Sequence, residues 1–172
     1  MYICQLKRKK RNMKDITLKS VIHVYKMSEL NKREQQLLEL AIGASERAYA
    51  PYSHFKVGAA VLLENGVEVT GCNQENAAYP SGLCAERTAV FSANSQYPDQ
   101  PIVALAIAAR NVNGLLKQPI TPCGACRQVM LEAEHRYQHP IRILLFGLES
   151  IYVVDSINDL LPLQFVSDSM TI

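Results

Sequence analysis

Residues 102–109 form an unbroken run of eight apolar residues, and this run constrains the fold more than any other feature of the chain. A strand with one face in water alternates apolar and polar residues, whereas a strand covered on both faces does not. Residues 141–146 form a second run that is nearly as apolar. The sequence therefore predicts a sheet with helices packed on both of its faces.

The segments around these two runs predict the remaining elements. Asn31 followed by Glu34 is a variant of the helix-capping pattern, and apolar residues then recur at three- and four-residue steps until Pro51 ends the helix. Asn65-Gly66 predicts a hairpin turn between two short strands. The expected strands are residues 57–63, 67–72, 102–109, 141–146 and 151–154, and the further expected helices are residues 84–95, 124–137 and 157–161. This order predicts a three-layer α/β/α sandwich with a mixed five-stranded sheet.

The charge distribution divides the chain into two unlike parts. Residues 1–26 contain eight Lys and Arg against one Asp, whereas residues 27–172 contain ten against fifteen acidic residues. We therefore expect a basic, disordered extension over residues 1–27 and a catalytic domain over residues 28–172. The acidic body disfavours nucleic acid as a partner. No apolar run is long enough to span a membrane, and the basic start is not followed by the apolar core of a secretory signal, so a cytoplasmic location is expected.

Three cysteines fall where a loop meets the start of a predicted helix. Cys84 precedes one helix, and Cys123 and Cys126 stand at the start of another. Helix N-termini favour negative charge and so favour thiolates. Two such helix starts facing each other would bring three thiolates onto one tetrahedral zinc and leave its fourth position for water, as in catalytic zinc sites. Glu86 would then lie beside that open position and could move protons.

Other interpretations of the cysteines and histidines carry less support. A Cys-X-X-Cys pair alone is as often a redox pair or half of a structural zinc site. We expect Cys72 to pack in the core and Cys4 to be an exposed bystander. His135 and His139 are four residues apart, but they lack the glutamate of the zinc-binding His-Glu-X-X-His motif, and Pro140 closes their helix.

Four segments resemble the small homotetrameric zinc-dependent cytidine deaminases. They are residues 50–60 (APYSHFKVGAA), 71–77 (GCNQENA), 84–89 (CAERTA) and 122–129 (PCGACRQV). The match extends over residues 30–166 in the order and spacing of that family. The zinc deaminases have an H-x-E…P-C-x-x-C pattern, and in this chain the first ligand is Cys84 in place of histidine, as in the branch that acts on free nucleosides.

The resemblance implies a Zn²⁺ cofactor held by Cys84, Cys123 and Cys126, with Glu86 as the catalytic proton carrier. Three thiolates give the metal an excess of negative charge, which Arg87 and Arg127 are suited to withdraw through hydrogen bonds to the sulfurs. Further residues match family positions that contact the substrate. They are Phe55 on the pyrimidine, Asn73 and Glu75 on the ribose 3′-hydroxyl, Ala85 on the base edge, and Tyr79 and Phe165, which reach a neighbouring subunit's site.

The expected function is zinc-dependent hydrolysis of free cytidine and deoxycytidine to uridine and deoxyuridine plus ammonia, in pyrimidine salvage, by a homotetramer. An acidic sugar contact at Glu75 disfavours a phosphorylated substrate, because two anions would meet in one pocket. One alternative is a deaminase of another cytosine nucleoside such as blasticidin S. A second is a polynucleotide deaminase recruited by the basic extension, and a third is a zinc-stabilised binding module without activity.

Overall fold

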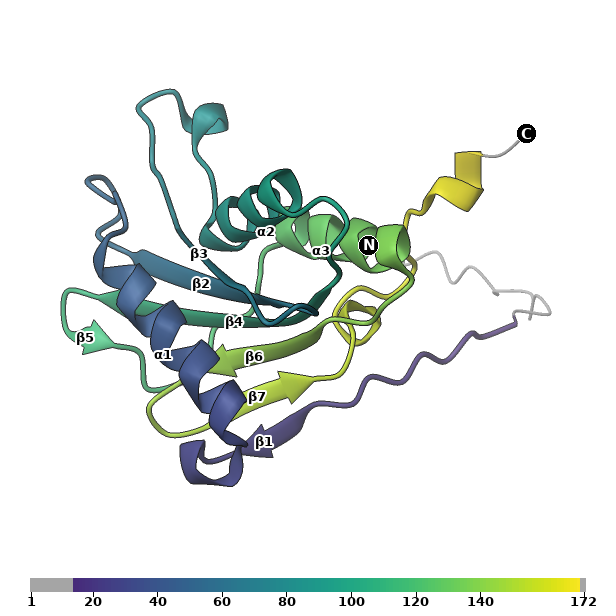
Figure 1. Cartoon of the computed structure of the whole chain (residues 1–172), viewed down its shortest axis with the longest axis horizontal. Coiled ribbons are helices and arrows are strands. Elements are labelled where there is room, and N and C mark those ends of the chain that lie inside the picture. The colour runs from purple at the N-terminus through teal and green to yellow at the C-terminus, as the bar shows by residue number, and fades with distance from the viewer. Residues whose placement is uncertain (1–13, 171–172) are drawn as a thin grey trace, which may run out of the picture.

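The computed structural model describes residues 14–170, and this part of the chain forms one seven-stranded sheet with three α-helices (Figure 1). The strands are β1 (His23–Tyr25), β2 (Lys56–Leu63), β3 (Glu68–Cys72), β4 (Ile102–Asn111), β5 (Gly114–Leu115), β6 (Arg142–Phe146) and β7 (Ile151–Val154). The helices are α1 (Lys32–Glu46), α2 (Ala85–Gln96) and α3 (Gly124–Tyr137), with 3-10 turns at Met27–Glu29, Tyr79–Ser81, Ile157–Asp159 and Ser167–Met170.

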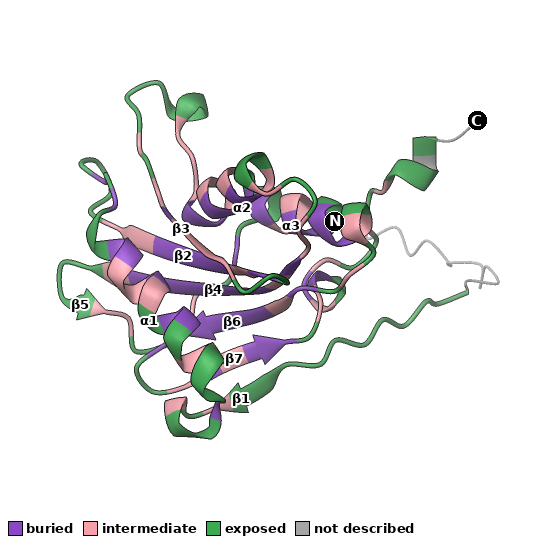
Figure 2. Ribbon diagram, viewed as in Figure 1, coloured by how far each residue is buried: buried purple, intermediate pink, exposed green. Residues whose placement is uncertain are grey.

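The sheet is mixed and is covered on both faces. Its strand order is β1-β7-β6-β4-β2-β3, with β5 paired to β4, and β4 and β6 run parallel while the other pairs are antiparallel. Helix α1 covers one face, and α2 and α3 lie together on the other (Figure 1). The strands between these layers are the most buried part of the molecule (Figure 2). The predicted three-layer α/β/α sandwich is confirmed.

Side chains alternate along β4 between two separate hydrophobic cores. Leu105 and Ile107 belong to the core beneath α2 and α3, whereas Ala104, Ala106 and Ala108 belong to the core beneath α1. The small residues let α1 lie close to the sheet. Gly58 shows how close, because a Cβ at this position would lie 2.1 Å from the carbonyl oxygen of Ala41.

The five strands expected from the sequence are β2, β3, β4, β6 and β7, and two further strands were not expected. Strand β1 pairs with β7 at the edge of the sheet along its whole length, with Val24 opposite Tyr152. This strand lies within residues 1–27, which the sequence predicts to be a disordered extension. Its side chains are mostly exposed, so backbone pairing holds it there without a sequence pattern to reveal it. Residues 1–13 lie outside the described part of the chain, and the boundary between extension and domain stays a prediction.

Helix α1 begins as expected and ends earlier than expected. Asn31 caps it by accepting a hydrogen bond from the Glu34 amide, and the Glu34 carboxylate accepts from the Asn31 amide in return. The helix ends at Glu46 and not at Pro51, because the backbone of Tyr49 pairs with the segment after β3. Within the described residues, no helix has both the length and the apolar character needed to cross a bilayer.

Candidate active site

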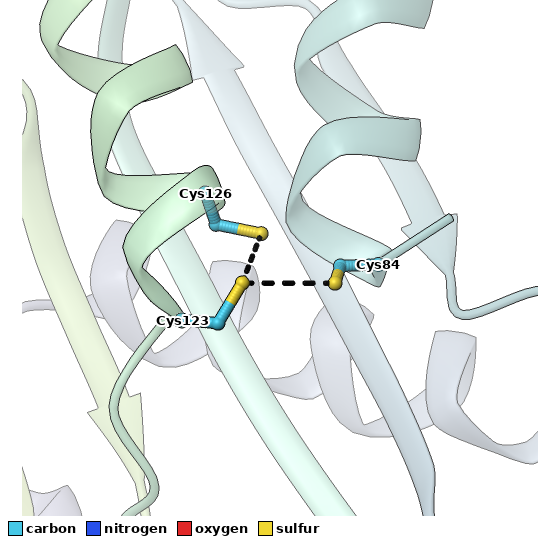
Figure 3. Close-up of side chains that lie close together, drawn as sticks. All are labelled: Cys84, Cys123 and Cys126. Carbon is cyan, nitrogen blue, oxygen red and sulfur yellow. Dashed lines mark hydrogen bonds between the residues drawn. The ribbon is translucent and has the colours of Figure 1, made fainter. Parts of the chain in front are cut away.

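Three cysteine side chains from two helix starts meet on one side of the sheet (Figure 3). Cys84 is the N-cap residue of α2, Cys123 is the N-cap residue of α3, and Cys126 lies in the first turn of α3. Both N-cap residues have extended backbone angles, and neither side chain caps its own helix. Their thiols are therefore free to point toward each other, in the field of two helix N-termini.

The spacing of the sulfur atoms fits a single tetrahedral zinc ion. The Sγ atoms of Cys84 and Cys123 are 3.9 Å apart, those of Cys123 and Cys126 are 3.5 Å apart, and all three lie within 4.8 Å of one another. A zinc–sulfur distance of about 2.3 Å in a tetrahedron gives sulfur separations of about 3.8 Å. These separations are also far longer than a disulfide bond, and the described cysteines are all free. The residues present fit Zn²⁺ with one position left open.

The three thiols shift one another's pKa values. The pKa of Cys84 is lowered, first by the adjacent Cys126 thiol and then by Arg87 and Cys123. The pKa of Cys126 is raised, because the Cys84 sulfur beside it carries the negative charge and because Cys126 is buried near the Glu86 carboxylate. Three thiols this close cannot all ionise without a cation among them, so the cluster favours metal binding.

Glu86 lies in the first turn of α2 and is 5% exposed. Burial raises the pKa of its carboxyl group, and the negative charge that develops on Cys84 raises it further. The adjacent Cys126 side chain opposes this shift. The structure therefore places a buried carboxylate, with a pKa moved toward neutrality, beside the sulfur cluster and not within it.

The two arginines that follow cysteines have different surroundings. The guanidinium of Arg87 donates to the Sγ of Cys84 at 3.5 Å, as expected. Among the described residues, the guanidinium of Arg127 has no hydrogen bond to sulfur and donates instead to the carbonyl oxygens of Pro122 and Leu160 and to the Thr121 hydroxyl. The expectation for Arg127 is corrected, because its side chain fixes the loop that leads into Cys123.

An open pocket of about 590 Å³ extends from Cys84 and Arg87 toward the segment after β3. Pockets of about 300–1,000 Å³ are typical for small molecules, so its size suits a nucleoside. Its walls come from the turn after α1, the loop between β3 and α2, and the start of α2. The lining residues are Tyr52, Ser53, Asn73, Gln74, Glu75, Asn76, Tyr79, Gly82, Leu83, Cys84 and Arg87.

Asn73 and Glu75 both line this pocket, and both side chains also form hydrogen bonds to the segment of residues 52–57. The Asn73 side chain accepts from the Val57 amide at 2.7 Å and donates to the Phe55 carbonyl oxygen at 3.0 Å. The Glu75 carboxylate accepts from the amides of Tyr52 and Ser53 and from the Ser53 hydroxyl. The Ser53 hydroxyl, followed by the Tyr52 amide, lowers the pKa of Glu75 below its usual value.

The other expected substrate contacts are placed less uniformly. Ala85 is fully buried at the start of α2, and Phe55 is half-buried beside the pocket without lining it. Tyr79 is 79% exposed at the pocket rim, where its ring meets that of Tyr52 edge to face. Phe165 is exposed on the C-terminal segment, and its carbonyl oxygen accepts a hydrogen bond from Gln128, away from the pocket of its own chain.

Cys72, His135 and His139 lie outside the sulfur cluster. The expectation that Cys72 packs in the core is corrected, because it lies half-buried at the end of β3, where its sulfur accepts a hydrogen bond from Gln74 at 3.2 Å. His139 contacts the Pro140 carbonyl oxygen, and neither it nor His135 joins a group of three potential ligands. In residues 14–170, Cys84, Cys123 and Cys126 form the one group of three or more potential ligands that lie close enough together to share a metal. Cys4 lies outside the described residues.

Sequence reasoning did not single out Tyr52, Ser53 or Leu83, which also line the pocket. Tyr52 and Ser53 lie inside residues 50–60, a segment that carries the family resemblance, so the sequence indicated that this segment lies near the site. What the pattern alone does not show is which of its side chains face the ligand. That depends on the tight turn around His54, which adopts a left-handed backbone conformation with φ of 53°.

Comparisons with known proteins agree with this geometry. Residues 31–138 match the family described as the cytidine and deoxycytidylate deaminase zinc-binding region. A cytidine deaminase of Halalkalibacterium halodurans is 41% identical over 136 residues, which cover 79% of this chain and 96% of that protein. A cytidine deaminase of Mycobacterium tuberculosis is 39% identical over 133 residues, covering 76% of this chain and 87% of that protein.

Solved structures show the same likeness. The crystal structure of cytidine deaminase from Burkholderia pseudomallei superposes with a TM-score of 0.65 at 43% sequence identity and covers 76% of this chain and 97% of that one. The structure of cytidine deaminase from Mycobacterium tuberculosis superposes with a TM-score of 0.61 at 35% identity and covers 77% of this chain and 97% of that one.

Proposed function

Because this chain belongs to the cytidine and deoxycytidylate deaminase family, we propose that its buried carboxylate and three-cysteine cluster act together on a free cytosine nucleoside. The chain is a zinc-dependent hydrolytic deaminase of cytidine, and we extend its substrates to deoxycytidine. The products are uridine or deoxyuridine and ammonia, as in pyrimidine salvage. The observation that supports this most is the position of Glu86, buried next to the three sulfurs.

Each residue of the cluster has a distinct task in this proposal. A Zn²⁺ held by Cys84, Cys123 and Cys126 supplies, when bound, a Lewis acid that lowers the pKa of a water in its open position. Glu86 takes a proton from the attacking water and delivers it to ring nitrogen N3, and then passes the second proton to the departing amino group. The raised pKa of Glu86 suits a group that must both accept and donate near neutral pH. Arg87 draws negative charge from the Cys84 sulfur.

The pocket favours an unphosphorylated ligand. Glu75 lines the pocket and is held as an anion, because Ser53 and Tyr52 stabilise its charged form. A phosphate on the sugar would meet this negative charge. We therefore propose free nucleosides as substrates, in the cytoplasm, with no nucleic-acid or membrane partner. A polynucleotide deaminase would bind single-stranded nucleic acid with an affinity that falls as salt rises. We do not expect such binding, because residues 27–172 carry a net negative charge.

We also propose a homotetramer, with Tyr79 and Phe165 reaching a neighbouring subunit. Several large apolar side chains are exposed to solvent in the single chain. They include Tyr79, which is 79% exposed, and Phe165, which is 60% exposed. Exposed apolar groups of this size are typical of interaction surfaces. Sedimentation equilibrium would test this, with an expected mass of four times the 19.2 kDa chain; a monomer would contradict it.

The activity is tested by incubating purified protein with cytidine and following the ultraviolet absorbance change as uridine forms. We expect turnover that a strong chelator abolishes and added zinc restores. Blasticidin S, assayed in parallel, separates the two nucleoside deaminases by relative kcat/KM, and we expect cytidine to be preferred. Protein that binds zinc but converts neither compound would indicate the binding module instead.

A further inference from the structure

Ser53 links the two walls of the pocket, although nothing in its sequence pattern assigns it a role. Its hydroxyl accepts a hydrogen bond from the Phe55 amide at 3.0 Å and donates one to Oε1 of Glu75. The Ser53 amide also donates to Oε2 of Glu75 at 3.3 Å. One exposed serine therefore holds the Glu75 carboxylate at two points and fixes the turn that leads to Phe55.

The acceptor capacity of Glu75 is nearly used up by these contacts. A carboxylate has about four acceptor positions on its two oxygens. Oε2 accepts from the amides of Tyr52 and Ser53, at 2.9 and 3.3 Å, and Oε1 accepts from the Ser53 hydroxyl. The described part of the chain thus occupies three positions, and about one position, on Oε1, is left for a ligand.

Asn73 has complementary capacity next to Glu75. Its Oδ1 accepts from Val57 and its Nδ2 donates to Phe55, so that within residues 14–170 one N–H of that amide is left for a ligand. Glu75 can thus accept one hydrogen bond while Asn73 donates one. A single hydroxyl group satisfies both, whereas an ether, a fluorine or a hydrogen atom does not.

We propose that Ser53 is a positioning residue for sugar recognition: its hydroxyl holds Glu75 so that one acceptor position faces the pocket, and this selects nucleosides that carry a free hydroxyl donor at that point of the sugar. The inference rests on the proposed function, because it takes the pocket to bind a nucleoside sugar at Glu75. Ser53 itself touches no reacting atom. Its loss changes sugar selection and leaves the chemical step at Glu86 alone.

The Ser53→Ala variant tests this with cytidine and 3′-deoxycytidine as paired substrates. We expect KM for cytidine to rise about 10-fold, the loss of one hydrogen bond to a charged group. We expect kcat to stay within about 2-fold and KM for 3′-deoxycytidine to be unchanged, because that substrate does not use the contact. Ser53→Thr keeps the hydroxyl and should restore most of the selection.

A merely structural role for Ser53 predicts a different result, since a distorted turn would weaken both substrates alike. Equal changes for the two substrates, or no change for either, would overturn the proposal. Ser81→Ala serves as the matched control, because Ser81 is an exposed serine on the loop that forms the facing rim.

Calorimetric binding of uridine and 3′-deoxyuridine gives the same comparison without turnover. If the unaltered protein binds both nucleosides but deaminates neither substrate, the proposed function fails and the binding difference still decides the role of Ser53. If the protein deaminates cytidine and Ser53→Ala leaves the sugar preference intact, the positioning role fails alone. Failure to bind either nucleoside, together with no deamination of cytidine, would overturn both.

Discussion

Replacing Glu86 with Gln isolates the proton-carrying role of its carboxylate. The two side chains have nearly the same shape, so the change keeps the packing of a residue that is 5% exposed. It removes the group that accepts and returns a proton, while Cys84, Cys123 and Cys126 remain. We therefore expect zinc binding and fold to be retained and turnover to be lost.

The size of the loss follows from the role assigned to Glu86. A positioned general acid–base contributes about 10²- to 10⁴-fold in rate, which corresponds to about 3–5.5 kcal/mol of transition-state stabilisation. Stability should not fall with it. Burial raises the pKa of Glu86, which means that the fold disfavours the charged carboxylate and accepts a neutral amide readily.

The assay compares kcat on cytidine, zinc content and thermal unfolding for Glu86→Gln and for the control Glu132→Gln. Glu132 is an exposed glutamate on α3, and its replacement should leave all three quantities unchanged. A Glu86→Gln variant with kcat within about 10-fold of the unaltered protein would refute the reasoning, because no general acid–base would then be missing.

Further predictions concern the metal, the packing of α1 and the pH dependence. Cys84→Ala should lower the zinc content of the protein and Cys72→Ala should not, as measured by elemental analysis. Equal zinc content in both variants would show that Cys84 is not a zinc ligand. Gly58→Ala should cost about 3 kcal/mol and lower Tm by about 6–12 °C, because the new Cβ meets backbone of α1 at 2.1 Å, whereas Gly43→Ala has no atom within 4 Å and should be tolerated in a melting experiment. The lowered pKa of Glu75 means that its contacts are complete above the usual 4.5 and are lost only as pH falls through the lower folded value. KM for cytidine should therefore stay constant as pH falls to the folded-state pKa of Glu75 and should rise below it. A rise already near pH 6 would contradict the role of ionised Glu75 in binding.

The layers of the fold could be predicted because burial on both faces leaves a direct trace in the sequence. The apolar run of β4 and the Asn65-Gly66 turn required no knowledge of distant contacts. Strand β1 could not be predicted in this way, because its residues are held by backbone pairing to β7 and remain exposed. The end of α1 depends on the pairing of Tyr49 with Gln74, which is also a contact between distant segments.

The candidate site divides along the same line. The sequence predicted the three sulfurs because helix starts and cysteine spacing are local features, and the structure brings all three within 4.8 Å. The direction of the Arg127 side chain depends on the carbonyl oxygen of Leu160, which is distant in sequence, so the expected sulfur contact was wrong. The partnership of Ser53 with Glu75 likewise appears only when the two walls of the pocket are brought together.

X-ray absorption at the zinc edge of the purified protein tests the central claim most directly. The three-cysteine site predicts one zinc per chain with three sulfur neighbours at about 2.3 Å and one lighter neighbour at about 2.0–2.2 Å, the open position on which deamination depends. Four sulfur neighbours would indicate a closed structural site, and zinc without sulfur neighbours would mean that Cys84, Cys123 and Cys126 do not bind it.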